Sequence, residues 1–200
     1  MQTSSPTSFN ELGFLVLRDF IPHEVLSLCR NYLQSVKERY AKKLGQASDF
    51  IENDEHHPNT FSFYSPLCTE VLLLKMLPEF ERLTGVKLVP SYSYARTYYK
   101  GSFLEKHTDR KCSQFGISIC LDRDEPDWPL IIIDRTAQAR SIELDRGDAV
   151  MFMGMQLEHY RDKFSGSAQT QIFLFYVEKN DLNSQFYFDR RPTLGSSPLK

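Results

Sequence analysis

Apolar residues in the first half of the chain recur with a helical spacing. Between Val25 and Tyr40 they fall every three or four positions, and polar or charged residues occupy the other side. Such a stripe predicts an amphipathic helix packed against the outside of a sheet, with Gly45 as its expected end. The same spacing returns over Pro66–Gly85, where Pro78 either kinks the helix or starts a second one.

Short apolar segments separated by turn residues dominate the second half of the chain. One strand is expected earlier, at Gly13–Asp19, and the others follow Val86. In chain order these later strands are KLVPSYSYARTYY, ISICLD, WPLIIID, RSIEL, DAVMFM and QTQIFLFYVE. Helices followed by strands with no helix between them predict an α+β fold. The number of strands suits a closed barrel or a sandwich.

A polar, irregular segment, Gln46–Ser65, lies between the two helical regions. It contains His56, His57 and Pro58, and adjacent histidines on a strand face opposite sides, which makes them a poor pair of metal ligands. We therefore expect a surface loop with solvated imidazoles. The functional alternative is a lid that carries substrate contacts.

The chain is expected to form one domain. Its 200 residues are enough to bury a sizeable core, and no internal repeat, low-complexity tract or linker divides them. The single domain therefore spans residues 1–200. Residues 1–8 and 190–200 are expected to be loose tails.

Composition and charge exclude several classes of function. Apolar residues make up 41% and charged residues 25% of the chain, and the formal net charge is −2. This balance gives no basic face for nucleic acid. The N-terminus lacks the pattern of a signal peptide, and no apolar run approaches the roughly 18 residues of a membrane span. The four cysteines show no paired spacing, so we expect reduced thiols in a cytoplasmic protein of undetermined oligomeric state.

The candidate chemistry centres on His107, Asp109 and His159. On an extended chain, His107 and Asp109 would point to the same side, because strand side chains alternate. Two histidines and one carboxylate that leave coordination positions open form the facial triad of non-haem Fe(II) oxygenases. The alternatives are that His107 ends a strand in solvent, Asp109 caps a turn and His159 is a buried structural histidine. Arg110 is a further candidate, for an anionic group of the substrate, although ideal alternation would point it away from Asp109.

The residues before this pair carry a family resemblance. The run resembles the Y-x-x-G-x-x-[YL]-x-x-H-x-D pattern of the 2-oxoglutarate/Fe(II) dioxygenases of prolyl-4-hydroxylase type. Its matching positions here are Tyr98, Gly101, Leu104, His107 and Asp109. Phe9–Leu33 resembles the opening strand and helix of that superfamily. Arg146–Phe152 resembles the strand before the distal histidine, and Gly166–Val177 resembles the last barrel strand.

The resemblance implies a fold and a reaction. The fold is the double-stranded β-helix, a jelly-roll or cupin-like barrel with N-terminal supporting helices, which holds the iron at its mouth. Fe(II) would be bound by His107, Asp109 and His159, and 2-oxoglutarate and O₂ would be converted to succinate and CO₂. Related halogenases have a small residue in place of the carboxylate, so Asp109 favours hydroxylation or desaturation. A small-molecule or amino-acid-type substrate is expected.

One departure concerns the residue that would hold the far carboxylate of 2-oxoglutarate. The family usually places an arginine or lysine after the distal histidine, but Gln169–Phe173 contains no cation. Arg96, two residues before Tyr98, and Arg161, two residues after His159, are the candidates, since a guanidinium grips a carboxylate bidentately. Tyr98 and Gln171 would add hydrogen bonds. The alternative is that both arginines lie on the surface.

The sequence therefore predicts a 2-oxoglutarate-dependent dioxygenase, most simply a hydroxylase. Two other classes stay open. The first is a non-catalytic, metal-binding cupin-like module, and the second is a jelly-roll interaction domain without a cofactor.

Overall fold

The computed structural model describes residues 6–41, 50–54, 57–124 and 127–195. Within them the helices are α1 (Pro6–Leu12), α2 (His23–Ala41) and α3 (Leu67–Thr84), followed by the 3₁₀ segments η1 (Lys111–Ser113) and η2 (Leu182–Arg190). The strands are β1 (Phe14–Leu17), β2 (Phe50–Asp54), β3 (His57–Tyr64), β4 (Leu88–Tyr99), β5 (Leu104–His107), β6 (Phe115–Arg123), β7 (Leu130–Ile133), β8 (Ala139–Ile142), β9 (Ala149–Phe152), β10 (His159–Arg161) and β11 (Ala168–Glu178).

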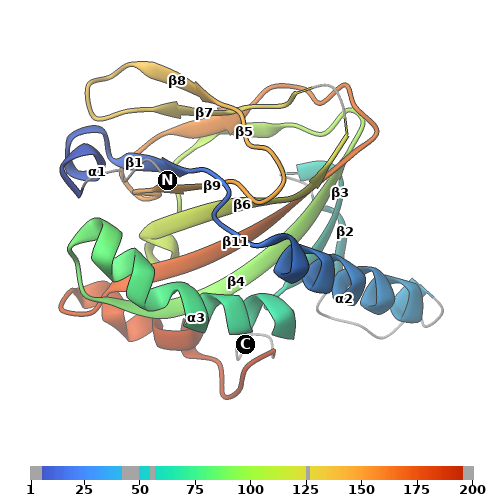
Figure 1. The fold of residues 1–200 in the computed structure, drawn as a ribbon, viewed down its shortest axis with the longest axis horizontal. Coiled ribbons are helices and arrows are strands. Elements are labelled where there is room, and N and C mark those ends of the chain that lie inside the picture. The colour runs from blue at the N-terminus through green and yellow to red at the C-terminus, as the bar shows by residue number, and fades with distance from the viewer. Residues whose placement is uncertain (1–5, 42–49, 55–56, 125–126, 196–200) are drawn as a thin grey trace.

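The described strands form two antiparallel sheets. The larger has the order β1-β9-β6-β11-β4-β3-β2, and the smaller has the order β5-β10-β7-β8. Helices α2 and α3 cover one face of the larger sheet, and the smaller sheet lies on its other side (Figure 1). This arrangement confirms the α+β class and the barrel of two facing sheets. None of the described helices combines the length and the apolar character that crossing a bilayer requires.

Strand β6, in the interior of the larger sheet, shows how that sheet separates the apolar core from a polar cavity. Ile117 and Ile119 are fully buried in the main apolar cluster, whereas Ser118 lines a cavity between the sheets. Successive side chains on a strand point to opposite faces. The sheet therefore presents apolar residues to the helices and polar ones to the smaller sheet.

The two long helices follow the predicted stripes. In α2, Leu26, Cys29 and Leu33 are buried against the sheet, as an amphipathic helix requires. Helix α3 is continuous, with Pro78 inside it, so the proline does not start a second helix. It ends at Gly85, which adopts a left-handed conformation and donates its N–H to the carbonyl of Glu81.

The expectation of an irregular loop over Gln46–Ser65 is wrong for the described part. Residues 50–54 and 57–64 form strands β2 and β3, which pair antiparallel, and β3 extends the larger sheet through β4. Thr60–Tyr64 alternates polar and aromatic residues, which is a strand pattern that the polar composition of the whole segment obscured. His56 lies outside the described residues.

Both expected tails are shorter than predicted. Helix α1 begins at Pro6, so residues 6–8 are helical, and residues 1–5 lie outside the described chain. At the other end Arg191 is buried, and residues 196–200 lie outside the described chain. Arg191 donates to the Glu70 carboxylate at 2.7 Å and to the carbonyl of Ser91. This contact fixes the segment that follows η2 beneath α3 (Figure 1).

The pair between Glu70 and Arg191 yields a test of the fold. Both side chains are fully buried, so removing one charge leaves the other buried and unpaired, which typically costs about 3–5 kcal/mol. We expect Arg191→Met to lower the free energy of unfolding by that amount, measured by urea denaturation. The double variant Glu70→Gln/Arg191→Met should recover much of the loss.

The control is Arg82→Met, which breaks an exposed pair with Glu79 on the same helix and should change stability little. Equal stability of Arg191→Met and Arg82→Met would contradict the assigned role of the buried pair.

Candidate active site

The two histidines lie opposite each other on neighbouring strands of the smaller sheet. His159 on β10 pairs in register with His107 on β5, which places their ring centroids 4.3 Å apart. Asp109 follows two residues after the end of β5, so strand alternation does not explain its direction. Its backbone N–H donates to the carbonyl of Gly154 at 2.8 Å. That hydrogen bond turns the chain so that the carboxylate faces both imidazoles.

The three side chains converge on one point. Oδ1 of Asp109 lies 3.7 Å from Nε2 of His107 and 3.7 Å from Nε2 of His159. One ligand atom from each residue lies within 4.8 Å of the others. His159 is buried and the other two are partly buried. One metal ion could contact all three atoms.

The tautomers of both histidines suit metal binding. Nδ1 of His107 lies 2.8 Å from the carbonyl of Glu105, and Nδ1 of His159 lies 3.0 Å from the carbonyl of Leu157. A carbonyl only accepts, so each Nδ1 carries the proton in these contacts. In the neutral ring Nε2 then keeps its lone pair, and both Nε2 atoms face Asp109.

The surroundings shift the pKa values of His107 and His159 in opposite directions. The neighbouring Asp109 carboxylate raises the pKa of His107 above its ordinary value, against the opposing effect of burial. Burial lowers the pKa of His159, which the Asp109 charge only partly offsets. His159 therefore favours the neutral form that a metal ligand needs.

Asp109 is held in a space that Gly154 leaves open, and Gly116 lies at contact distance from the same carboxylate. A side chain at Gly154 would place its Cβ 2.2 Å from Oδ2 of Asp109, and one at Gly116 would place it 3.4 Å away. Oδ2 is buried, and no donor among the described residues hydrogen-bonds to it. A buried carboxylate oxygen without a donor is costly, and a cation beside it would remove that cost.

The triad fits a divalent metal on these observations. Two imidazole nitrogens and one carboxylate match the donor set of a facial triad. Asp109 and both histidines are thus brought together as predicted. Gly154 was missed, although a glycine among the large residues of MFMGMQ is the signal expected where backbone and side chain approach closely.

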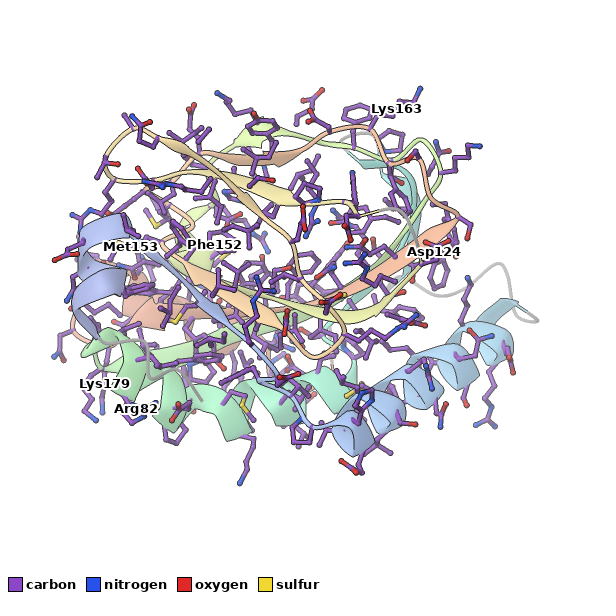
Figure 2. All side chains as sticks on the ribbon, turned by 45° about the horizontal axis from the view of Figure 1, so that its top comes forward. Arg82, Asp124, Phe152, Met153, Lys163 and Lys179 are labelled. Atoms are coloured by element: carbon purple, nitrogen blue, oxygen red, sulfur yellow. The ribbon has the colours of Figure 1, made fainter. Side chains whose placement is uncertain are left out.

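A cavity of about 430 Å³ opens between the two sheets beside the triad. Figure 2 shows Phe152, which ends β9, among the side chains that fill this interior. The cavity is lined by Tyr64, Tyr92, Tyr94, Arg96, Tyr98, Leu104, His107, Asp109, Arg110, Ser118, Leu130, Phe152, His159, Arg161, Phe173 and Phe175.

Both candidate arginines face this cavity and not solvent. Arg161 is 3% exposed, donates to the carbonyl of Trp128 and lies over the indole ring at 4.8 Å. Burial lowers the pKa of its guanidinium. Arg96 is 8% exposed and bonded through Nε to the hydroxyl of Ser62, and its guanidinium stacks on Tyr94. The alternative of two surface arginines is therefore wrong.

Gln171 and Tyr98 lie on the same face of the larger sheet. Gln171 pairs with Arg96 across the two strands, and its carbonyl oxygen accepts from the Ser118 hydroxyl at 3.1 Å. Its Nε2 is buried, and no described residue accepts from it. Tyr98 is 1% exposed and packs edge-on against Trp128. The Gln171 amide therefore lies on the sheet face that carries Arg96 and Tyr98, next to the residues that line the cavity.

No protein-family model matches this chain, and no curated protein matches it in sequence. Solved structures do match. A prolyl-4-hydroxylase from Pseudomonas putida is 12% identical, with a TM-score of 0.64 over 86% of this chain and 96% of that one. HygX from Streptomyces hygroscopicus, solved with nickel, 2-oxoglutarate and hygromycin B, is 12% identical, with a TM-score of 0.70 over 90% and 88%.

A third match is SnoK from nogalamycin biosynthesis, a non-haem α-ketoglutarate-dependent carbocyclase. It is 13% identical, with a TM-score of 0.71 over 100% of this chain and 94% of that one. At such identities the likeness shows the fold. The chain has the double-stranded β-helix fold found in the 2-oxoglutarate/Fe(II) oxygenases, as the sequence resemblance implied.

The glycine beside Asp109 provides a direct test of the site. In Gly154→Ala the added methyl group would occupy the space of the Asp109 carboxylate. We expect at least a tenfold loss of affinity for Co(II) or Fe(II), measured by calorimetry under anaerobic conditions, with unchanged circular dichroism. Gly85→Ala is the control for backbone strain: nothing lies within 4 Å of its added Cβ, but its φ of +71° is unfavourable for alanine, so it should lower stability and leave metal affinity unchanged. Unaltered metal binding by Gly154→Ala would contradict the position assigned to Asp109.

Metal binding should also depend on pH in one direction. Protons compete with a metal for Nε2, so affinity falls as pH falls. Because the pKa of His107 is raised and that of His159 is lowered, the loss should begin above the ordinary imidazole value of 6.5 and reflect His107 first. Calorimetric titration between about pH 8 and about pH 6 measures this. Constant affinity across the range would contradict the assignment.

Proposed function

We propose that the chain is an Fe(II)- and 2-oxoglutarate-dependent oxygenase that hydroxylates a small molecule. The observation that carries the proposal is that the His107–Asp109–His159 triad and the buried cation of Arg161 share one cavity. The triad suits Fe(II), and the arginine suits the far carboxylate of a 2-oxo dicarboxylic acid. The fold shared with 2-oxoglutarate-dependent enzymes supports both assignments.

The protein's part in the reaction is to hold the metal and to orient the co-substrate and substrate beside it. His107 and His159 present neutral Nε2 atoms, fixed by backbone carbonyls behind each ring, and Asp109 presents Oδ1 between them. Bound Fe(II) would supply the redox chemistry that couples decarboxylation of 2-oxoglutarate to oxidation of a substrate C–H bond. The apolar residues Leu104, Leu130 and Phe152 line the cavity around the triad and limit the access of water.

Arg161 is our choice for the carboxylate anchor. Its guanidinium is buried, and no carboxylate among the described residues forms an ion pair with it. A buried charge without a counter-charge is costly, so a ligand carboxylate would gain most of its binding energy there. Arg161 also follows His159 on the same strand face, as the sequence suggested. Arg96 is already held by Ser62 and by the ring of Tyr94.

Tyr98 and Gln171 are the proposed partners of that carboxylate. Tyr98 lines the cavity beside Arg161, and both pack against the indole of Trp128. Nε2 of Gln171 is a buried donor for which no described residue provides an acceptor. A carboxylate oxygen would satisfy it.

Hydroxylation is the proposed outcome because Asp109 occupies the position that a halide would need. SnoK, which shares this fold, is a carbocyclase. Identifying the product would therefore distinguish hydroxylation from other reactions. The small-molecule substrate is supported by the size of the cavity and by hygromycin B in HygX. We also infer that the protein acts in the cytoplasm, from its unpaired cysteines.

Turnover tests the proposal. We expect purified protein with Fe(II), ascorbate and O₂ to convert 2-oxoglutarate to succinate, even slowly without a second substrate, and His159→Ala to abolish this. Fe(II) binding without any succinate over a panel of metabolites would indicate the non-catalytic cupin-like module. Absence of Fe(II) binding would indicate an interaction domain.

The anchor is tested by comparing two arginines. We expect Arg161→Ala to weaken 2-oxoglutarate binding by two to four decades, because loss of one member of a buried ion pair costs about 3–5 kcal/mol. Arg96→Ala should weaken it by less than tenfold. Affinity is measured by anaerobic calorimetry, with Fe(II) binding determined separately for each variant. A larger effect of Arg96→Ala would transfer the role to Arg96.

A further inference from the structure

We propose that the mouth of the cavity is the binding site for the second substrate, and that Arg110 there recognises an acidic group on a molecule with a flat, ring-shaped apolar body. The inference rests on the proposed function for the reaction that follows binding. The proposed binding site consists of side chains that are not assigned to the metal or to the co-substrate.

Arg110 lies directly beside the metal-ligand candidate Asp109. Strand β5 ends at His107, and the next regular element, η1, begins at Lys111. Asp109 and Arg110 therefore belong to a connecting turn, where strand alternation does not force them apart. Both side chains line the cavity. A group bound by Arg110 would thus belong to a molecule that reaches the triad.

The cavity has an excess of positive charge. Among the described residues, its lining includes the guanidinium groups of Arg96, Arg110 and Arg161 and a single carboxylate, that of Asp109, so Arg110 and Arg161 alone already exceed it. Fe(II) and the two carboxylates of 2-oxoglutarate would cancel each other and leave this excess in place. A further anion would therefore be attracted, and a cation repelled.

Arg110 is the cavity arginine that a second molecule can reach. Its side chain is 61% exposed, whereas Arg96 and Arg161 are 8% and 3% exposed. Its guanidinium lies 4.8 Å from the centroid of the Tyr92 ring. Stacking on an aromatic face leaves the N–H groups at the edge of the guanidinium free to bind a carboxylate or phosphate bidentately.

A wall of parallel aromatic rings adjoins this cation. Tyr92 stacks on Tyr64 at 5.4 Å and on Phe175 at 4.5 Å, with interplanar angles of 16° and 24°. Phe173 lies parallel to Phe175 at 6.3 Å. All four side chains line the cavity. Aromatic walls favour flat apolar partners, which stack or pack edge to face.

The carboxylate of Asp189 lies near Arg110 and would compete with a bound anion for its guanidinium. Oδ2 of Asp189 lies 3.8 Å from Arg110 and accepts from the Tyr64 hydroxyl at 2.6 Å. Phe188, Asp189 and Arg190 all have positive φ, a conformation that is unfavourable for non-glycine residues. The buried contact of Arg191 with Glu70 holds this segment in place. Asp189 therefore competes weakly, at long distance, for the cation that an incoming anion would bind.

The size of the cavity limits the occupant. A volume of about 430 Å³ lies near the lower end of the range of about 300–1,000 Å³ for small-molecule sites, and 2-oxoglutarate would occupy part of it. The second substrate is therefore a small organic acid with one or two rings.

The test uses three probes with the same ring and chain, namely 3-phenylpropanoate, 3-phenylpropanamide and 3-phenylpropylamine. Their dissociation constants are measured by equilibrium dialysis against the anaerobic Fe(II) protein, with and without saturating 2-oxoglutarate. Saturation keeps the acid from the Arg161 position. We expect the acid to bind at least tenfold tighter than the amide, and the amine to bind weakest.

Two variants should shift this preference in opposite directions. Arg110→Gln should reduce the preference for acid over amide to less than twofold, and Arg110→Lys should restore part of it. Asp189→Asn, which still accepts from Tyr64, should increase the preference about threefold by removing the competing charge. The matched control is Arg82→Gln, since Arg82 is also an ion-paired arginine with a 63% exposed side chain. It lies on the helical side of the molecule, at the lower left of Figure 2.

The outcomes separate this inference from the proposed function. Equal affinity for acid and amide, preference for the amine, or a preference that survives in Arg110→Gln would overturn the inference, even when 2-oxoglutarate binds normally. An Arg110-dependent preference in a protein that fails to bind 2-oxoglutarate would support the anion site and overturn the proposed function.

Discussion

The charge inside the barrel is the constraint on which this structure depends. Arginine side chains are rarely buried without a counter-charge, yet Arg161 is 3% exposed and no carboxylate among the described residues pairs with it. The protein tolerates this cation by stacking it on the indole of Trp128 and bonding it to the backbone carbonyl of the same residue. Such neutral contacts hold a guanidinium in place without cancelling its charge. The interior is thus prepared for anions.

The two sheets contribute different residues to the cavity. The smaller sheet supplies both histidines through the pairing of β5 with β10, and Arg161 follows on the same strand. The larger sheet supplies the aromatic wall of the cavity, while the helices behind it bury the apolar core. The segment after η2 is fixed to α3 by the contact of Arg191 with Glu70. The two histidines, Arg161 and most of the aromatic wall thus rest on strands, which suits a preorganised site, whereas Asp109 lies in a turn that its hydrogen bond to Gly154 holds.

Local pattern was enough to predict the parts of this site that depend on local spacing. The helical stripes, the later strands, the triad and the inward direction of Arg96 and Arg161 all follow from periodicity and motif. The motif identified Asp109, but strand alternation does not explain its direction. Its hydrogen bond to Gly154, a tertiary contact that sequence spacing does not encode, orients it. Strand β3 was missed because the polar residues Thr60 and Ser62 fill its alternate positions and give the segment a loop-like composition. The burial of Arg191 depends on Glu70, far away in sequence.

The most direct test of the central claim is whether 2-oxoglutarate binding depends on the metal. In anaerobic calorimetry, 2-oxoglutarate is titrated into the protein first without metal and then loaded with Fe(II). If one cavity holds the iron at the triad and the far carboxylate at Arg161, 2-oxoglutarate should bind at least tenfold tighter to the Fe(II) form, with a stoichiometry of one. Equal affinity in the two forms, or no binding in either, would contradict the account.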